Sequence, residues 1–407
     1  GTIYYTRKMY SQAIKPLDRA VELLPDDFES LYMLGISLVE SGEYSKAISP
    51  LGRARAIKKT DTGILELTAL CYRKLNQNSS LMDFLREWIK IDPKRYDIKI
   101  ELGSLMLQEK KVSEAIKMLK EAAKFVPSDV RPRLLLAEAY EVSGNDSLRL
   151  FELKNALKFA PQEWEAHYQT GRYYMSKGAH EEAEQHLARA VDLHQGHAGA
   201  RFDYGCLLLE LGKPAASLTQ LNSALEKDPN NARYIATAAY ALCLTGDQKR
   251  GLQNISVALG KSTSDEQVLY WAGRVYYQVG KKEQARQAFD DALSIDPSFA
   301  PCFEALGDIS MEELKFKDAA RNYFRSWEKG GYNERRAFKL GSALTYDRKF
   351  VEARDFYEAV VKRNPGFSEA VYRLVEVHCE LNELEKARAL LKNFKKDGSP
   401  WMQLAQG

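Results

Sequence analysis

The chain has 407 residues, of which 45% are hydrophobic and 28% are charged. Its 59 Lys and Arg residues nearly balance its 56 Asp and Glu residues, and a formal net charge of +3 gives no electrostatic reason to expect binding to nucleic acid or to an anionic membrane. The longest uncharged stretch, Tyr234–Gly246, is too short to cross a bilayer as a helix, so we expect no transmembrane span in these residues.

The first regular feature along the chain is a series of prolines whose spacing is 34 residues or a multiple of 34. The series consists of Pro25, Pro93, Pro127, Pro161, Pro229, Pro297 and Pro365. A fixed period of this length, unbroken by insertions, predicts an array of helical repeats that bury one continuous core between neighbours. We therefore expect a single elongated domain, although the length alone would suggest two or three globular domains.

Within each repeat the sequence predicts two helices separated by a tight turn. In Phe28–Ile57, apolar residues recur at helical spacing on both sides of Gly42. A Gly just past a helix supplies a left-handed turn, and comparable breaks recur at Gly144, Gly178, Gly212, Gly246 and Gly280. The prolines then stop the second helices. We find no alternating pattern typical of strands, so the prediction is an all-α fold.

Columns of small residues share the period and predict where neighbouring helices cross closely. One column reads Gly1, Gly35, Ala69, Gly103, Ala137, Gly171, Gly205, Ala239, Gly273, Gly307, Gly341 and Val375. Bulky residues such as Leu51 and Phe289 form another column, where they would interlock with the small ones. Large residues replace small ones at Leu81 and Trp88 in the third repeat and at Arg149 in the fifth, which predicts altered packing angles there.

The most regular repeat, Glu266–Pro297, carries a recognisable set of residues, namely Gly273, Tyr276, Ala285, Phe289, Ala292 and Pro297. With these columns the whole chain resembles the tetratricopeptide repeat (TPR) family. The resemblance implies an α-solenoid, in which antiparallel helix pairs form a right-handed superhelix and first helices line a concave groove. It implies repeats at 1–27 (truncated), 28–61, 62–95, 96–129, 130–163, 164–197, 198–231, 232–265, 266–299, 300–333, 334–367 and 368–401.

Both ends of the chain fall at informative points of the repeat. Gly1 occupies the small-residue column, so the sequence opens in the middle of a first helix and we expect it to be part of a longer polypeptide. Pro400 lies one residue from the proline series. Because terminal repeats normally need a polar outer face, we expect either that the array continues past residue 407 or that a partner covers that end.

The cysteines and histidines suggest structural rather than chemical roles. The five cysteines are odd in number and lack CxxC spacing: Cys71, Cys206, Cys243, Cys302 and Cys379. We expect free thiols, which favour a reducing compartment such as the cytoplasm; the alternative is a Cys206–Cys243 disulfide in an oxidising setting. The resemblance to the TPR family adds the bacterial cell envelope or the periplasm as an alternative location. Four histidines cluster at His180, His186, His194 and His197. Solvated turn histidines are expected and a metal site is the alternative, since no ligand motif of known spacing accompanies them.

No motif points to catalysis. The sequence contains no Gly-rich phosphate loop, nucleophile elbow or HExxH helix, so we expect no enzyme activity and no cofactor. Two specific TPR activities also lack their residues: no repeat supplies the groove Lys and Asn of a cochaperone clamp, and the asparagine ladder of the nucleocytoplasmic sugar transferase is absent.

The candidate binding residues lie on first helices, in or beside the column expected to face the groove. They are aromatic residues and Arg, the types that dominate binding hot spots: Tyr168, Arg172, Phe202, Tyr240, Tyr270, Trp271, Arg274, Tyr277, Phe338 and Tyr372. The alternative for any single ring is packing between adjacent first helices.

These features predict a non-enzymatic scaffold that binds a protein or peptide segment in its groove, in the assembly of a multiprotein complex. The alternative is a regulatory or substrate-recruiting arm of an enzyme whose catalytic domain lies outside these residues. No nucleic-acid partner is expected, and the sequence specifies neither the partner's identity nor the oligomeric state.

Overall fold

A computed structural model describes residues 1–394, which form 24 α-helices and no strand. The all-α prediction is therefore confirmed over this range. The last part of the twelfth expected repeat, including Pro400 and the residues after it, lies outside the described residues.

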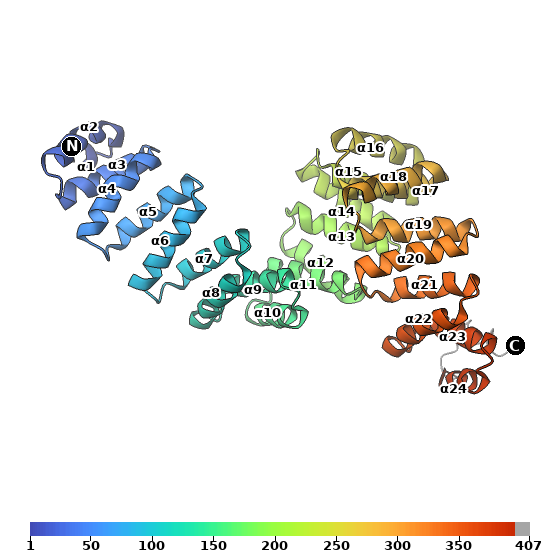
Figure 1. Ribbon diagram of the computed structural model, residues 1–407. Coiled ribbons are helices and arrows are strands. Elements are labelled where there is room, and N and C mark those ends of the chain that lie inside the picture. Colours follow the sequence, from blue (N-terminus) through green and yellow to red (C-terminus); the bar gives the residue numbers. More distant parts are fainter. Residues whose placement is uncertain (395–407) are drawn as a thin grey trace. The chain divides into compact units, whose positions relative to one another are not determined.

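The helices fall into two compact units, one ending at Gln169 and the other beginning at Thr170. In the first unit, consecutive helices pair and stack along the chain (Figure 1). Its helices are α1 (Thr2–Thr6), α2 (Tyr10–Leu23), α3 (Phe28–Glu40), α4 (Tyr44–Ile57), α5 (Thr62–Lys74), α6 (Asn78–Ile91), α7 (Tyr96–Gln108), α8 (Val112–Phe125), α9 (Arg131–Val142) and α10 (Asp146–Phe159).

The second unit continues the same alternation of first and second helices, and α11 (Trp164–Ser176) contains the boundary between the units. The remaining helices are α12 (His180–Leu193), α13 (Ala198–Glu210), α14 (Pro214–Lys227), α15 (Ala232–Leu244), α16 (Gln248–Lys261), α17 (Glu266–Gln278), α18 (Lys282–Ile295), α19 (Ala300–Glu312), α20 (Phe316–Gly330), α21 (Glu334–Tyr346), α22 (Phe350–Arg363), α23 (Ser368–Glu380) and α24 (Leu384–Phe394). A single array across the boundary stays a prediction.

The turns between paired helices have the left-handed geometry that the sequence predicts. All six glycines assigned to these turns have positive φ, from 69° at Gly144 to 99° at Gly246. In other repeats the same conformation is adopted by Lys8, Asn76, Lys110, Leu314, Arg348 and Asn382. Side-chain caps start several first helices; Asp27, for example, accepts a hydrogen bond from the backbone N–H of Ser30 at 2.9 Å.

The small-residue column marks close helix crossings, as expected. A Cβ atom added to Gly35 would lie 2.5 Å from Leu51 Cδ2, and one added to Gly307 would lie 2.5 Å from Tyr323 Cε1. Both distances are shorter than van der Waals contact, so a side chain at either glycine would push the paired helices apart. The interlocking of small and bulky columns is thereby confirmed.

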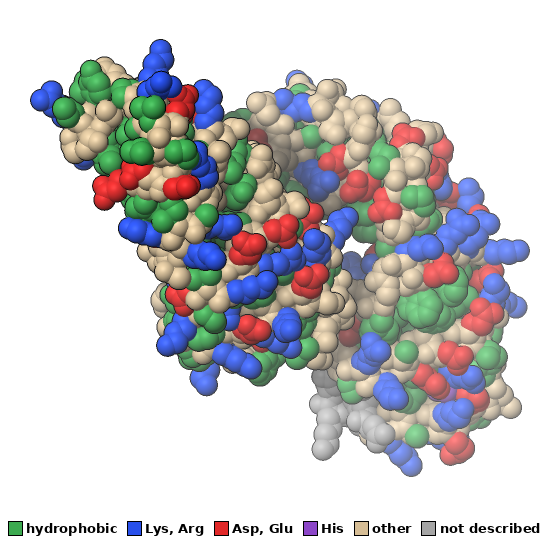
Figure 2. Space-filling view, turned by 60° about the vertical axis from the view of Figure 1, so that its left-hand side comes forward, with side chains coloured by type: hydrophobic (Ala, Val, Ile, Leu, Met, Phe, Trp, Pro, Cys, Tyr) green, Lys and Arg blue, Asp and Glu red, His purple; other side chains and the backbone are tan. Residues whose placement is uncertain are grey.

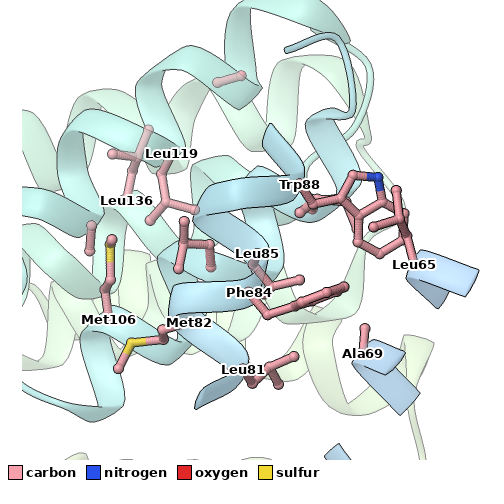
Figure 3. Close-up of a cluster of buried hydrophobic side chains, with 14 of the residues drawn as sticks. Leu65, Ala69, Leu81, Met82, Phe84, Leu85, Trp88, Met106, Leu119 and Leu136 are labelled. Atoms are coloured by element: carbon pink, nitrogen blue, oxygen red, sulfur yellow. The ribbon is translucent and has the colours of Figure 1, made fainter. Parts of the chain in front are cut away.

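In the third repeat, large side chains occupy positions that are small in most other repeats, and they are buried. Trp88 and Leu81 of α6 are 1% and 2% exposed, and they belong to one buried cluster with residues of α5, α7, α8 and α9. Figure 3 shows the Trp88 ring beside Leu65 of α5. In the fifth repeat Arg149 is buried and pairs with Glu141 at 3.0 Å.

Charged side chains of both signs are interspersed over the face shown in Figure 2. This mixture agrees with the near balance of acidic and basic residues in the sequence. Selectivity for a charged partner must therefore come from local arrangements of charges, since neither sign dominates this face or the composition.

Candidate functional site

Four of the predicted binding residues form one cluster on α15 and α17. The guanidinium of Arg274 donates hydrogen bonds to the hydroxyl oxygens of Tyr240 (2.5 Å) and Tyr270 (2.9 Å), and it lies over the Tyr240 ring at 4.7 Å from the centroid. Trp271 completes the cluster, with ring centroids 5.4 Å from Tyr240 and 5.1 Å from Tyr270. These four residues therefore lie together on two adjacent first helices.

This cluster is largely occupied with its own contacts. Tyr240 is only 7% exposed, and burial raises the pKa of Tyr270 to about 12. The Tyr270 ring also packs against Phe289 and Phe299. For Tyr240 and Tyr270 the alternative interpretation applies, because their rings and hydroxyls stabilise the contact between adjacent first helices.

Three further predicted residues of the second unit make separate contacts. Phe202 of α13 stacks on Tyr234 of α15 with ring centroids 4.7 Å apart. The Tyr277 hydroxyl donates to Glu312 on α19. Arg172 of α11 is exposed and lies 3.7 Å from Asp203 of α13.

The other three predicted residues lie elsewhere. Tyr168 belongs to the first unit, where its ring stacks near Trp164 at 6.3 Å. Tyr372 of α23 is half-buried, and its pKa is raised chiefly by a hydrogen bond with Glu376. Phe338 of α21 packs on Phe367 at 4.9 Å and lines a cavity of the second unit.

This cavity, which we call the second groove, has a volume of about 1110 Å³. It is formed where the turn after α11 faces the loop between α20 and α21, with further walls from the ends of α13 and α22. Its aromatic lining is Tyr332, Phe338 and Phe367, and its Lys and Arg lining is Lys177, Arg335, Lys339 and Arg363. A Cβ atom added to Gly178 would lie 3.5 Å from Asn333 Nδ2, which shows how closely the turn and the loop approach.

Lys339, which lines the second groove, belongs to an ion-pair network. Lys339 binds Glu304 at 2.7 Å and Asp308 at 2.8 Å. Burial favours a raised pKa for Glu304, but Lys339 and Arg336 outweigh it and the pKa is lowered, so this carboxylate stays ionised. Asp308 also accepts a hydrogen bond from the Tyr323 hydroxyl at 2.7 Å.

Glu210 of α13 also lines the second groove. Burial raises its pKa, although nearby His180 and Arg335 act in the opposite direction. The Glu210 Oε2 and His180 Nδ1 atoms are 3.4 Å apart. Glu210 therefore carries a desolvation cost that its neighbours only partly offset.

The first unit contains a cavity of about 820 Å³, which we call the first groove. It is lined mainly by residues of first helices α3, α5 and α7, and also by Trp88 of α6. Its floor is apolar and consists of Tyr32, Ile36, Leu67, Leu70, Trp88 and Ile98. Tyr32 and Glu66 belong to the column expected to face the groove, but the sequence did not single them out, because that column shows fewer aromatic residues in this half of the chain.

Several residues of both grooves were missed from the sequence. Lys339 neighbours the predicted Phe338, and Arg335 lies one helical turn before it, so their place on α21 was available as a signal. Lys177 and Tyr332 lie in connecting segments, whose approach to one another follows from no repeat pattern.

The cysteines and histidines show no sign of a chemical centre. All five cysteines are free thiols, and burial raises the pKa of Cys71 to about 11 and that of Cys302 to about 12. Within residues 1–394, no group of three or more His, Cys, Asp or Glu side chains is arranged to hold a metal ion. His194 and His197 lie edge to face at 5.8 Å. No helix of the described range is long and apolar enough to cross a membrane.

Three family models match segments of the chain. Residues 6–87 match the anaphase-promoting complex (cyclosome) subunit 3 family, residues 174–240 match the tetratricopeptide repeat, and residues 212–371 match the C-terminal ARM domain of tetratricopeptide repeat protein 21.

Similar curated proteins are also repeat proteins. TPR repeat-containing protein YpiA of Bacillus subtilis is 19% identical, over 91% of this chain and 96% of its own length. Human tetratricopeptide repeat protein 6 is 25% identical over 77% of this chain, and mouse superkiller complex protein 3 is 22% identical over 94% of it. The match spans 62% of the human protein and 26% of the mouse protein.

Among solved structures, yeast Tom70 aligns over 93% of each chain with 11% identity and a TM-score of 0.47. A tetratricopeptide repeat protein from Parabacteroides merdae aligns over 60% of this chain and 96% of its own, with 19% identity and a TM-score of 0.47.

The family assignment rests on three observations: the 34-residue columns, the paired helices of both units and the matched repeat families. The chain belongs to the tetratricopeptide repeat family of protein-interaction scaffolds.

Proposed function

We propose that the second unit binds an extended or helical segment of a partner protein in the second groove, and that the chain thereby serves the assembly of a multiprotein complex without catalysing a reaction. The observation that carries this proposal is the cavity of about 1110 Å³ that brings Phe338 together with other aromatic and basic side chains. Cavities of this size take up several side chains of a ligand at once.

The chemistry of the lining supports a protein partner. Aromatic rings supply large rigid contact areas, and Arg supplies both a charge and planar hydrogen-bond donors. Arg335 is exposed and its guanidinium forms no ion pair with any of residues 1–394, so it is available to a ligand. Two of the similar families or proteins are named as subunits of complexes, which favours a role in assembly.

The test begins with a random peptide library, selected on the purified chain. Selected peptides are then titrated by fluorescence anisotropy against the unaltered chain, against Arg335→Glu, and against Lys249→Glu, an equal charge change on the exposed surface of α16. We expect Arg335→Glu to weaken binding about tenfold or more and Lys249→Glu to leave it within about twofold. Peptides that bind both variants equally well would overturn this assignment of the second groove.

A further inference from the structure

The first groove combines an apolar floor with an excess of carboxylates on its rim. Ile36 and Leu70 lie four residues after Tyr32 and Glu66 on α3 and α5, so they point to the same side of their helices. Both side chains are only partly buried, and they belong to the floor of the 820 Å³ cavity. This floor can therefore take up an apolar side chain from another molecule.

The arginines around this floor are already neutralised. Each of the three makes a two-pronged contact with one carboxylate: Arg73 with Glu101 (2.7 Å for the Nη2 atom), Arg95 with Asp97 (2.7 Å) and Arg131 with Asp129 (2.7 Å). Such paired hydrogen bonds hold both the guanidinium and the carboxylate in fixed positions. None of these three arginines is therefore free to bind an acidic ligand without first breaking its pair.

Two carboxylates remain on the rim. Glu40, the last residue of α3, is exposed and forms no ion pair with any residue in the described part of the chain. Glu66 is 62% exposed, and its nearest cationic atom, Nη2 of Arg95, is 3.7 Å away and already bound to Asp97. The balance of charges around the apolar floor is thus negative.

The ionisation of nearby tyrosines agrees with this balance. The pKa of Tyr32 is raised by burial and also by Asp61 and Glu66. The pKa of Tyr5 is raised by burial, by Tyr10 and by Glu40. Two phenols on neighbouring helices therefore experience the same carboxylates that a ligand in the groove would meet.

We propose that the first groove is a second binding site, for a partner-protein segment that places an aliphatic or aromatic side chain on the apolar floor and Lys or Arg side chains against Glu40 and Glu66. Charge complementarity selects this occupant over an acidic one, because an acidic segment would bring like charges to the rim. The site lies entirely in the first unit and does not depend on the second groove.

The probe for this site is a short fluorescent peptide in which Leu alternates with Lys, compared with a peptide in which Glu replaces each Lys. Titrated against the full chain, the Leu/Lys peptide is expected to bind at least about tenfold more tightly than the Leu/Glu peptide. The double variant Glu40→Lys/Glu66→Lys should weaken the Leu/Lys peptide about tenfold. Both positions are exposed, and Lys at the C-terminal end of α3 is favoured by the helix dipole, so the variant should fold.

A matched control carries the same charge change elsewhere. Glu226→Lys/Glu352→Lys alters two exposed residues of α14 and α22 and should leave the affinity within about twofold. Arg335→Glu, which tests the second groove, should leave it unchanged as well. Equal affinity for the two peptides, or equal loss in the Glu40/Glu66 and Glu226/Glu352 variants, would overturn the proposal. A Leu70→Asn variant that keeps its melting temperature but binds the Leu/Lys peptide as well as the unaltered chain would also contradict it.

Discussion

The two units use corresponding positions of the repeat to opposite effect. Positions in the first groove and in the second unit correspond across 238 residues, or seven periods of 34: Tyr32 with Tyr270, Ile36 with Arg274, Glu66 with Glu304, and Leu70 with Asp308. The Tyr and the Glu are the same in both units. The residue four positions later, one turn along the same face, is apolar in the first unit and charged in the second.

This difference decides whether the surface is open or filled. Arg274 donates a hydrogen bond to Tyr270, and Asp308 binds Lys339, so the polar residues of the second unit satisfy one another. The side chains of Ile36 and Leu70 are apolar and cannot form hydrogen bonds or ion pairs, so they contribute an apolar floor to the first groove. The lesson is that the same groove column specifies a ligand surface only in combination with the residue one helical turn away.

The largest expected effect is a loss of stability that is confined to the first unit. Trp88→Ala should destabilise the first unit by about 3–5 kcal/mol, because Trp88 is 1% exposed and a large cavity would remain under the first groove. Cys71 is the only cysteine of the first unit, so its labelling by a thiol reagent under native conditions reports opening there. Labelling of Cys71 should accelerate while that of buried Cys302 does not. Equal acceleration of both would show that the units do not open separately.

The next effect tests whether the polar filling of the second unit is structural. Arg274→Met keeps the length of the side chain but removes both hydrogen bonds to tyrosine hydroxyls and the contact with the Tyr240 ring. We expect a loss of about 2 kcal/mol in the free energy of unfolding, measured by denaturant titration. Arg250→Met, at an exposed position of α16 where the arginine side chain is 69% exposed, should cost less than about 0.5 kcal/mol. Equal costs would mean that the cluster contributes nothing beyond an ordinary surface arginine.

A smaller effect is expected when the arginine found at position 274 of the second unit is placed at the corresponding position 36 of the first groove. In Ile36→Arg the new guanidinium lies one turn from both Tyr32 and Glu40, so it can bind them and cover the apolar floor. The affinity for the Leu/Lys peptide should fall about tenfold, with little change in melting temperature. Ser45→Arg, which adds the same charge at an exposed position of α4, is the control. Undiminished affinity in Ile36→Arg would break the comparison between the two units.

The repeat period was sufficient to predict the fold, whereas the binding residues chosen from it stay a prediction. It predicted the helix pairs, the glycine turns and the close crossings, because each depends on local sequence within one repeat. It also placed Tyr240 and Arg274 on facing positions of adjacent first helices. It could not predict that the Tyr240 hydroxyl and the Arg274 guanidinium would bind each other and so be less available to a ligand, since that depends on side-chain conformations.

The two cavities depend on information that the period does not contain. The second groove requires the turn at Gly178 to approach the loop at Asn333, which are separated by several repeats. The charge balance of the first groove depends on which of its arginines already form ion pairs. Arg73 and Glu101 have compatible charges in the sequence, but only their geometry shows that Glu40 is left over.

The smallest effect concerns pH, and it has opposite signs in the two grooves. The pKa of Asp97 in the first groove is lowered, chiefly by its hydrogen bonds with Arg95. Its ionised form therefore stabilises the fold above its unfolded pKa, and this contribution is lost as the pH falls through the folded pKa. Asp97→Asn should lower the melting temperature at pH 7 by about 2 °C, and the difference should shrink in acid.

Glu210 in the second groove should behave in the reverse way. Because burial raises its pKa, the folded state binds the proton more tightly than the unfolded state, and stability falls as the pH rises from the unfolded pKa through the folded one. The Glu210 side chain is 54% exposed, so solvent screens most of this penalty. Glu210→Gln removes a charge that the folded state disfavours, and it should raise the melting temperature at pH 7 by no more than about 1 °C and lose this advantage near pH 4. Thermal unfolding of both variants over that pH range measures the two signs side by side. A melting temperature lowered at pH 7 in Glu210→Gln would mean that His180 and Arg335 more than offset the burial of Glu210, and that the second groove, like the first, is stabilised by its carboxylate.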